Sequence, residues 1–145
     1  MLQSALGERI EGMRVADIMD AHPVAIPAPT AVTQALEEYF ERYGWSWFPV
    51  VDESGRFVGV ARQERARASA DAGEGWLTVG AIVESEEAGS WRVDAEKPIA
   101  ELLASDGLRA LGALMAVDGE GVLRGVVTVE QVRRALQSAF GSMAA

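Results

Sequence analysis

The clearest hydrophobic pattern in the chain is that of a helix between residues 30 and 43. Apolar residues recur there at steps of three and one, as they do on one face of an α-helix: Val32, Ala35, Leu36, Tyr39, Phe40 and Tyr43. Charged residues fill the other face. Thr30 is placed to cap the start of this helix, and Gly44 is placed to end it. The pattern predicts an amphipathic helix with a buried apolar face.

Two strands joined by a tight turn are predicted next. Residues 45–51 are apolar on both faces, which indicates a strand covered on both sides. The segment Asp52–Gly55 has the composition of a hairpin turn, and residues 57–60 form the returning strand. Trp45 and Trp47 have two interpretations, because such aromatic residues fill a core or subunit contact, or stack against an adenine ring.

The same strand–turn–strand pattern returns later in the chain. Four residues recur with an offset of 66 positions, so that Asp52, Gly55, Gly59 and Val60 correspond to Asp118, Gly121, Gly125 and Val126. Such self-similarity indicates two copies of one structural unit. Each copy is predicted to contain a short helical turn, an extended edge, a helix, two strands and a final helix.

The repeat sets the predicted domain organisation. In the first copy the elements lie at 15–19, 21–29, 30–43, 45–51, 57–60 and 63–70. In the second copy they lie at 77–83, 91–93, 98–103, 111–117, 122–127 and from 128 onward. The inward residues of the last two helices are predicted to be Ile99, Leu102, Leu103, Val132, Leu136, Ala139 and Phe140. The chain therefore divides into a lead-in (1–12), a first repeat (13–70), a connector (71–76), a second repeat (77–140) and a tail (141–145).

Composition and charge exclude several classes of function. With 145 residues and 49% hydrophobic content the chain can fold around a core, while a net charge of −9 disfavours a nucleic-acid partner. The absence of cysteine excludes disulfides, thiolate metal sites and a cysteine nucleophile. The single histidine, His22, is predicted to be a loop residue, and no metal site is expected. No catalytic triad, phosphate-binding loop or membrane span is present, so we expect a soluble, cytoplasmic segment that is not itself an enzyme.

The sequence resembles a tandem pair of CBS domains, the arrangement called a Bateman module, over residues 13–137. Phe48–Asp52 with Gly59 carries the resemblance in the first copy, and Ala116–Asp118 with Gly125–Thr128 carries it in the second. The resemblance implies an α+β fold of two CBS repeats related by pseudo-two-fold symmetry. It also implies a regulatory module that forms a homodimer through its CBS pairs.

A narrower resemblance concerns the residues from the predicted helix to the first turn. Tyr39–Asp52 is similar to the CBS pair at the C-terminus of bacterial site-2 protease family membrane zinc metallopeptidases. This resemblance implies that the effector is an attached intramembrane protease, whose zinc-binding helix lies outside this segment.

The family resemblance also indicates ligands and the residues that hold them. CBS pairs often bind AMP, ADP, ATP or S-adenosylmethionine in the cleft between the repeats. The binding motif of the family is Gly-h-h-Thr-x-x-Asp, where h is an apolar residue. Its threonine contacts the phosphate, and its aspartate contacts the ribose hydroxyls. The second copy keeps Thr128 but has Gln131 for the aspartate, and the first has Arg62 and Arg65 at these two positions. Arg65 offers no acceptor to a ribose hydroxyl, so binding in the usual mode is disfavoured. The candidate ligand-binding residues are Thr128, Gln131, Arg62, Arg65, Pro49 and Val50.

Several interpretations stay open at the level of sequence. Arg62, Arg65 and Arg67 form either an anion pocket or a solvated, ion-paired helix face. Thr128 contacts a phosphate or caps the last helix. The acidic segment 84–87 is predicted to be a solvated loop. As a whole the chain is either a sensor of a small adenosine-like ligand that controls an attached effector, or a ligand-independent dimerisation or docking module whose nucleotide motifs are degenerate.

Overall fold

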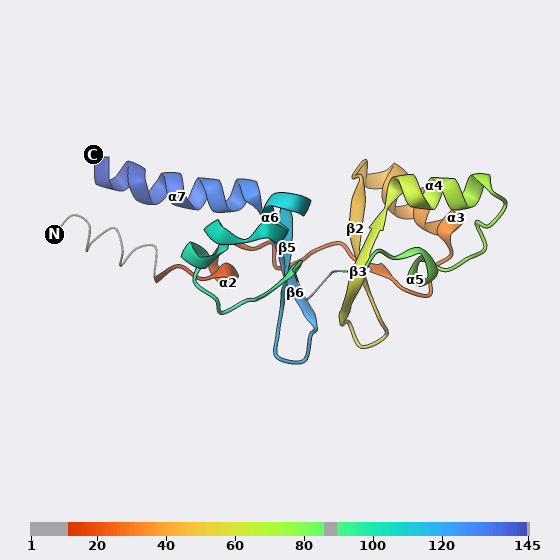
Figure 1. The fold of residues 1–145 in the computed structure, drawn as a ribbon, viewed down its shortest axis with the longest axis horizontal. Helices are drawn as coiled ribbons and strands as arrows, with labels where there is room; N and C mark the ends of the chain where they lie inside the picture. Colours follow the sequence, from red (N-terminus) through yellow and green to blue (C-terminus); the bar gives the residue numbers. More distant parts are fainter. Residues whose placement is uncertain (1–11, 86–89, 145) are drawn as a thin grey trace. The chain divides into compact units, whose positions relative to one another are not determined.

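The computed structural model describes residues 12–85 and 90–144, and the side chains of the last helix as far as Ser138. It contains two three-stranded sheets, of strand orders β1-β2-β3 and β4-β5-β6, with helices beside each sheet (Figure 1). The two sheets arise from one repeated order of elements, which confirms the predicted α+β class with two pseudo-symmetric repeats. By their contacts, the described residues form a first-repeat unit, residues 24–85 and 120–123, and a second-repeat unit, residues 12–23, 90–119 and 124–144.

The sheet of the first-repeat unit is built on a central buried strand. Strand β2 (Trp47–Val51) pairs in parallel with β1 (Ile26–Pro27) and antiparallel with β3 (Phe57–Arg62). Phe48 and Pro49, on opposite faces of β2, are both buried, which confirms a strand covered on both sides. Strand β1 is short because proline cannot donate a ladder hydrogen bond and is confined to sheet edges.

The turn between β2 and β3 has the geometry predicted from its composition. Gly55 has a φ of 80°, a left-handed conformation in which glycine carries no Cβ penalty. The Asp52 carboxylate accepts hydrogen bonds from the backbone N–H groups of Ser54 at 2.9 Å and of Arg56 at 3.0 Å. The aspartate therefore stabilises the turn, as its position in the sequence indicates.

The predicted amphipathic helix is present, and its backbone hydrogen bonds change part-way along from an α-helical to a π-helical pattern. It begins as α3 (Val32–Ala35), continues as a π-helical segment η1 (Leu36–Glu41), and ends before Gly44, whose φ is 71°. The predicted apolar face is buried at Phe40, which is 1% exposed. The prediction that Tyr43 also belongs to the buried face is wrong. Tyr43 is 40% exposed, because it lies beyond the π-helical turn at the end of the helix.

Thr30 is not the residue that caps this helix. The N-cap is Ala31, which makes no side-chain capping bond. The backbone of Thr30 is engaged instead, since its N–H donates to the Pro27 carbonyl at 3.0 Å and its carbonyl accepts from Val79 N–H at 2.7 Å. Thr30 therefore belongs to the turn before the helix, one residue earlier than a cap.

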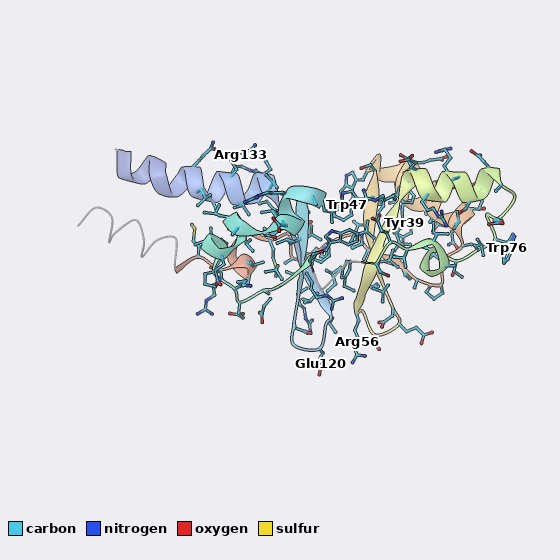
Figure 2. All side chains as sticks on the ribbon, in the orientation of Figure 1. Tyr39, Trp47, Arg56, Trp76, Glu120 and Arg133 are labelled. Carbon is cyan, nitrogen blue, oxygen red and sulfur yellow. The ribbon has the colours of Figure 1, made fainter. Side chains whose placement is uncertain are left out.

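Two further helices complete the first-repeat unit. Helix α4 (Gln63–Asp71) follows β3 directly, as predicted, and lies beside α3 (Figure 1). Helix α5 (Val79–Ile82) packs against β1 and β3 with Val79 fully buried. Between α4 and α5 the chain places Trp76 at the surface, 73% exposed (Figure 2).

The second-repeat unit reproduces this sheet. Strand β5 (Ala113–Val117) is the central strand, pairs in parallel with β4 (Arg92–Asp94) and has β6 (Leu123–Thr128) on its other side. All five residues of β5 are buried, as expected for a strand covered on both faces. Helix α7 (Val129–Ala144) follows β6, and Val132 on its inner face is 4% exposed.

The segment before β5 differs from the prediction. The helix expected from residue 98 is a 3-10 segment, η2 (Ile99–Ala104), in which Leu103 is 54% exposed rather than inward. A helix that was not predicted follows it: α6 (Asp106–Leu111), capped by the Ser105 hydroxyl and ended by Gly112 at a φ of 82°. Because α6 takes up Leu111, β5 begins two residues later than predicted.

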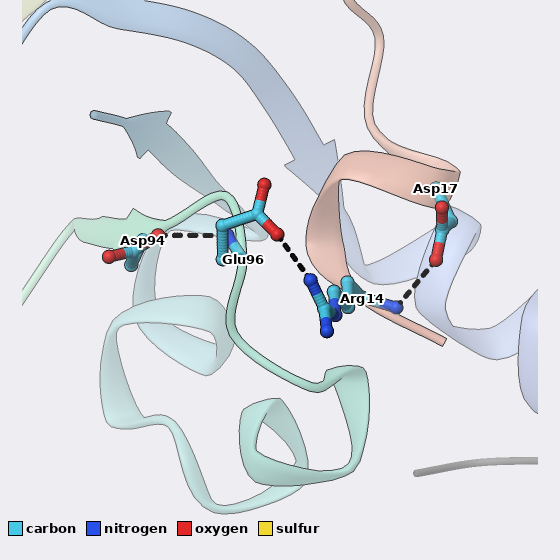
Figure 3. Close-up of polar contacts among 4 residues, drawn as sticks. All are labelled: Arg14, Asp17, Asp94 and Glu96. Atoms are coloured by element: carbon cyan, nitrogen blue, oxygen red, sulfur yellow. Dashed lines mark hydrogen bonds and ion pairs between the residues drawn. The ribbon is translucent and has the colours of Figure 1, made fainter. Parts of the chain in front are cut away.

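The short helix α2 (Val15–Ile18) belongs by its contacts to the second-repeat unit. Val15 N–H donates to the Lys97 carbonyl at 2.9 Å, and the Arg14 guanidinium pairs with the Glu96 carboxylate at 2.6 Å (Figure 3). In the same way α5, which opens the second repeat in sequence, packs within the first-repeat unit. Each contact unit thus contains the short helix that the sequence assigns to the other repeat. The predicted domain boundaries follow the sequence repeat and stay a prediction.

Parts of three predictions lie outside the described residues: most of the lead-in, residues 86–87 of the acidic segment, and the inward side chains of Ala139 and Phe140. Within the described part of the chain, no helix combines the length and apolar character that a membrane crossing needs.

Candidate functional site

The first-repeat unit contains a pocket with a volume of about 320 Å³. It is formed where β3 ends, α4 begins and the chain leaves α5. Its lining residues are Val60, Arg62, Arg65, Ala81, Ile82, Val83 and Glu84. Two of the sequence-predicted candidates, Arg62 and Arg65, are therefore brought together at one pocket.

The pocket depends on a backbone pairing between Val60 and Glu84. Val60 N–H donates to the Glu84 carbonyl at 3.0 Å, and Glu84 N–H donates to the Val60 carbonyl at 2.9 Å. On the β2 side Val60 lies opposite Pro49 in the antiparallel pairing. The N–H and the carbonyl of Val60 point to the other side of β3, where they meet the segment after α5.

Gly59 permits this close approach. An added Cβ at Gly59 would lie 2.5 Å from the Glu84 carbonyl oxygen and 2.6 Å from a Val83 methyl carbon, and its φ is 155°. No other residue fits there without displacing the backbone after α5.

One wall of the pocket is apolar. Val60 is 0% exposed and Ile82 is 7% exposed, while Val83 is half-buried beside them. Small-molecule sites typically combine such an apolar wall with a few convergent polar groups. This wall can take the flat, weakly polar part of a ligand.

The other wall is charged and contains an ion pair. Arg62 is the N-cap residue of α4, and its Nε lies 2.6 Å from a carboxylate oxygen of Glu84. Arg65, in the first turn of α4, is exposed and forms no hydrogen bond or ion pair with the described residues. The two arginines and one glutamate carry a formal charge of +2 − 1 = +1. The wall therefore favours an anion, although cations at a helix N-terminus oppose the helix dipole.

Glu84 corrects the prediction of a solvated loop. Its backbone pairs with Val60 and its carboxylate pairs with Arg62, so the residue is part of a built site. Arg67 lies further along α4, is exposed and does not line the pocket. Arg62 is ion-paired, as one of the two interpretations of the three arginines predicts. Arg62 and Arg65 line a pocket, and anion binding there stays a prediction.

Thr128 and Gln131, in the second-repeat unit, hydrogen-bond to each other. Gln131 N–H donates to the Thr128 hydroxyl at 3.2 Å, and Thr128 N–H donates to the Gln131 amide oxygen at 2.8 Å. This reciprocal pair is a capping box at the start of α7. The structure thus shows the capping role predicted for Thr128, and a phosphate contact stays a prediction.

The second-repeat unit has the same backbone pairing with different side chains. Asp20 N–H donates to the Val126 carbonyl at 2.8 Å, and Val126 N–H donates to the Asp20 carbonyl at 3.1 Å. Asp20 and Val126 thus correspond to Glu84 and Val60. Thr128 occupies the position of Arg62, so the counterpart of Glu84 has no arginine at that place.

The remaining candidates lie elsewhere in the first-repeat unit. Pro49 and Val50 are buried in β2 and do not line the pocket. Trp45 is 47% exposed and stacks on Phe48 at 5.0 Å between ring centroids, so it extends an aromatic cluster. Within the described residues no group of three histidine, cysteine, aspartate or glutamate side chains could hold a metal ion.

Sequence reasoning missed Glu84 and the apolar residues from α5. The available signal was the repeat itself, because the segment after 77–83 corresponds to the segment after 15–19. The sequence did not indicate that Glu84 pairs with Val60, because backbone hydrogen bonds do not depend on a particular side chain.

Comparison with known proteins finds a CBS domain in the first repeat and a shared fold over most of the chain. Residues 15–66 match the CBS domain family model. Across 93% of this chain and 94% of the other, the fold matches the CBS domain of a bacterial CNNM/CorC family Mg²⁺ transporter solved in complex with ATP, with a TM-score of 0.68 and 25% identity. By fold, the chain is a tandem pair of CBS domains.

Two more solved structures are similar to this chain in fold. CbpB in complex with c-di-AMP has a TM-score of 0.82 and 10% identity over 99% of this chain and 96% of its own. CBSX2 in complex with AMP has a TM-score of 0.70 and 21% identity over 88% of this chain and 98% of its own. The comparison with curated proteins gives no match.

Proposed function

We propose that this CBS pair is a regulatory module that binds a phosphorylated adenosine ligand in the pocket of the first-repeat unit. The observation that carries the proposal is the pairing of Arg62 and Arg65 with the apolar wall of Val60, Ile82 and Val83. Similar CBS structures were solved with ATP, AMP and c-di-AMP, all of which combine a flat base with phosphate. Binding would change the geometry that the module imposes on an attached effector.

The chemistry of the two walls matches the two ends of such a ligand. Guanidinium groups bind phosphate oxygens through charge-assisted, often bidentate hydrogen bonds. The apolar wall suits the base, and a volume of about 320 Å³ lies at the small end of ligand pockets. Because Arg65 cannot accept a hydrogen bond from ribose, phosphate contributes most of the affinity. We therefore expect ATP and ADP to bind more tightly than AMP, and adenosine least.

The family resemblance also suggests S-adenosylmethionine as a ligand. We expect it to bind less tightly than ATP, because it carries a sulfonium cation and the excess positive charge of Arg62 and Arg65 disfavours a cation. In the second-repeat unit the position of Arg62 is Thr128, which caps α7 together with Gln131. We therefore assign the phosphate to the first-repeat unit.

The proposed effector is an intramembrane zinc protease of the site-2 type. The support for it is the similarity of Tyr39–Asp52 to the CBS pairs of that family. We also propose that the chain forms a homodimer through its CBS pairs and acts in the cytoplasm, where adenosine nucleotides are present.

A ligand-independent docking module is the second candidate function. Two observations favour it: the amide oxygen of Gln131 is already used by the capping box, and aromatic surface is exposed at Tyr43 and Trp45. On this hypothesis the ion pair of Arg62 with Glu84 only stabilises the fold.

Thermal unfolding of the whole chain with ATP, ADP, AMP, adenosine and S-adenosylmethionine separates the two candidates. A ligand at 100 times its Kd adds about 2.7 kcal/mol of stability, which raises Tm by roughly 5–10 °C in a chain of this size. The variant Arg65→Gln should weaken ATP binding about tenfold, since it removes a charged donor. Arg67→Gln is the matched control on the same helix, and it should bind as the wild type does.

The outcomes are distinct. A shift that follows phosphate number and is lost in Arg65→Gln supports the sensor. No shift with any ligand, together with a dimer in size-exclusion chromatography, supports docking. Equal losses in Arg65→Gln and Arg67→Gln would show that the ligand responds to general charge and not to this pocket.

A further inference from the structure

We infer that Glu84 is a built-in competitor for the phosphate, which lowers the affinity of the pocket until the ligand displaces it from Arg62. This inference rests on the proposed function, because it concerns regulation of the same pocket. Its physical basis is that a carboxylate and a phosphate use the same kind of oxygen acceptor on a guanidinium.

The geometry places Glu84 where a ligand anion would bind. Its carboxylate oxygen is 2.6 Å from Arg62 Nε, and the side chains of Arg62 and Glu84 are 42% and 51% exposed. Both residues line the pocket. The contact is open to solvent on one side, so an incoming phosphate can reach Arg62 as the carboxylate moves away.

The backbone keeps Glu84 close to the site in either state. Its N–H and carbonyl both pair with Val60, so only the side chain needs to rotate for the exchange. A tethered group competes at a high effective concentration. The carboxylate therefore returns to Arg62 whenever the ligand leaves.

Arg65 supplies the contact that starts the exchange. It lines the same pocket and has no ion-pair partner within the described part of the chain. A phosphate can bind Arg65 first and then compete for Arg62. The second-repeat unit has no such arrangement, because Thr128 stands where an arginine would be needed opposite Asp20.

The test is the affinity for ATP of the whole chain, measured by titration calorimetry for wild type, Glu84→Gln and Glu53→Gln. Glutamine keeps the size of the side chain and the backbone pairing but removes the charge. From the energy of a solvent-exposed ion pair, Glu84→Gln should tighten ATP binding roughly twofold to fivefold. Glu53→Gln removes the same charge from the exposed turn at the other end of β3, and should change affinity by less than about twofold.

A double-mutant cycle with Arg62→Gln shows whether Glu84 acts through Arg62. In the Arg62→Gln background the gain from Glu84→Gln should disappear, and adenosine, which has no phosphate, should bind all variants alike. Glu84→Asp keeps the charge but shortens the reach to Arg62, so its affinity should lie between those of the wild type and Glu84→Gln.

The possible failures are separable. ATP binding that is equal in wild type and Glu84→Gln would overturn the competition and leave the proposed function standing. A gain that persists without Arg62 would overturn it as well, in favour of simple repulsion. No ATP binding to either protein would overturn the proposed function and this inference together.

Discussion

Replacing Gly59 with alanine tests the backbone arrangement on which the pocket is built. The added Cβ would lie 2.5 Å from the carbonyl oxygen of Glu84 and 2.6 Å from Val83, distances that folded proteins do not tolerate. The obstacle is backbone on one side and a branched side chain on the other. The segment after α5 must therefore move away from β3, and its two hydrogen bonds with Val60 must weaken or break.

The expected cost follows from these contacts. Two backbone hydrogen bonds are worth about 0.5–1.5 kcal/mol each, and a side chain at a φ of 155° adds about 1–3 kcal/mol of strain. Because partial relaxation lowers the sum, we expect Gly59→Ala to reduce the free energy of unfolding by about 2–4 kcal/mol. With a urea slope near 2 kcal/mol per molar, the unfolding midpoint should fall by roughly 1–2 M.

The assay is equilibrium unfolding in urea followed by far-ultraviolet circular dichroism. Gly119→Ala is the matched control, because nothing lies within 4 Å of its added Cβ and its φ is not in the left-handed region. The control should unfold within about 0.5 kcal/mol of the wild type. A loss below about 1 kcal/mol in Gly59→Ala would refute the tight pairing of the chain after α5 with β3.

Two other predictions concern stability. Thr128→Ala removes the hydroxyl of the capping box and should cost about 1 kcal/mol, seen as a lower Tm, while the exposed Ser138→Ala on the same helix should leave Tm nearly unchanged. Burial, followed by the charge of Glu38, raises the pKa of Tyr39 above its ordinary 10.0. The folded state therefore holds the phenol proton more tightly than the unfolded state, so this contribution to stability is complete below pH 10 and is lost as the pH rises through the folded-state pKa. In urea titrations from pH 8 to 11, Tyr39→Phe should flatten that alkaline decline; an unchanged slope would contradict it.

The sequence predicted the sheets well because both local and repeated patterns pointed to the same elements. Apolar residues on both faces of β2, a turn with Gly55, and a second copy at a fixed offset leave little freedom for another arrangement. A two-sided apolar strand must be covered on both faces, and it is. The order of the elements follows from these constraints, and the resemblance to CBS pairs implied the fold class.

The helices were predicted less well where packing decides. The apolar stripe through Tyr43 continues in the sequence, but the π-helical segment changes the period and leaves Tyr43 partly outside. Likewise Leu103 fits an inward face at helical spacing, whereas a 3-10 segment with three residues per turn turns it outward. Helix α6 had a readable signal in the Ser105 cap and Gly112, which the apolar pattern of the following strand obscured.

The residues of the candidate site also fall into those that the sequence predicted and those that it missed. Arg62 and Arg65 were found because they depart from a family motif, which is a property of the sequence. Glu84 was missed because its importance comes from a backbone bridge to Val60 across 24 positions of chain, where 84 − 60 = 24. Pro49 and Val50 were proposed from the motif, but their burial in β2 makes them supports of β3 and not lining residues.

The two repeats share a scaffold and differ in charge, and this difference is the strongest argument for a specific role of the first. Both repeats pair an acidic residue with a valine through the same two backbone bonds, at Glu84 with Val60 and at Asp20 with Val126. The scaffold alone does not require an arginine, because the second repeat forms it with Thr128 and a capping box. Stability of the helix would be served better by such a cap than by cations at its N-terminus. Arginines at 62 and 65 therefore act against helix stability at this position, and the anion binding that we propose for the adjacent pocket would offset their cost.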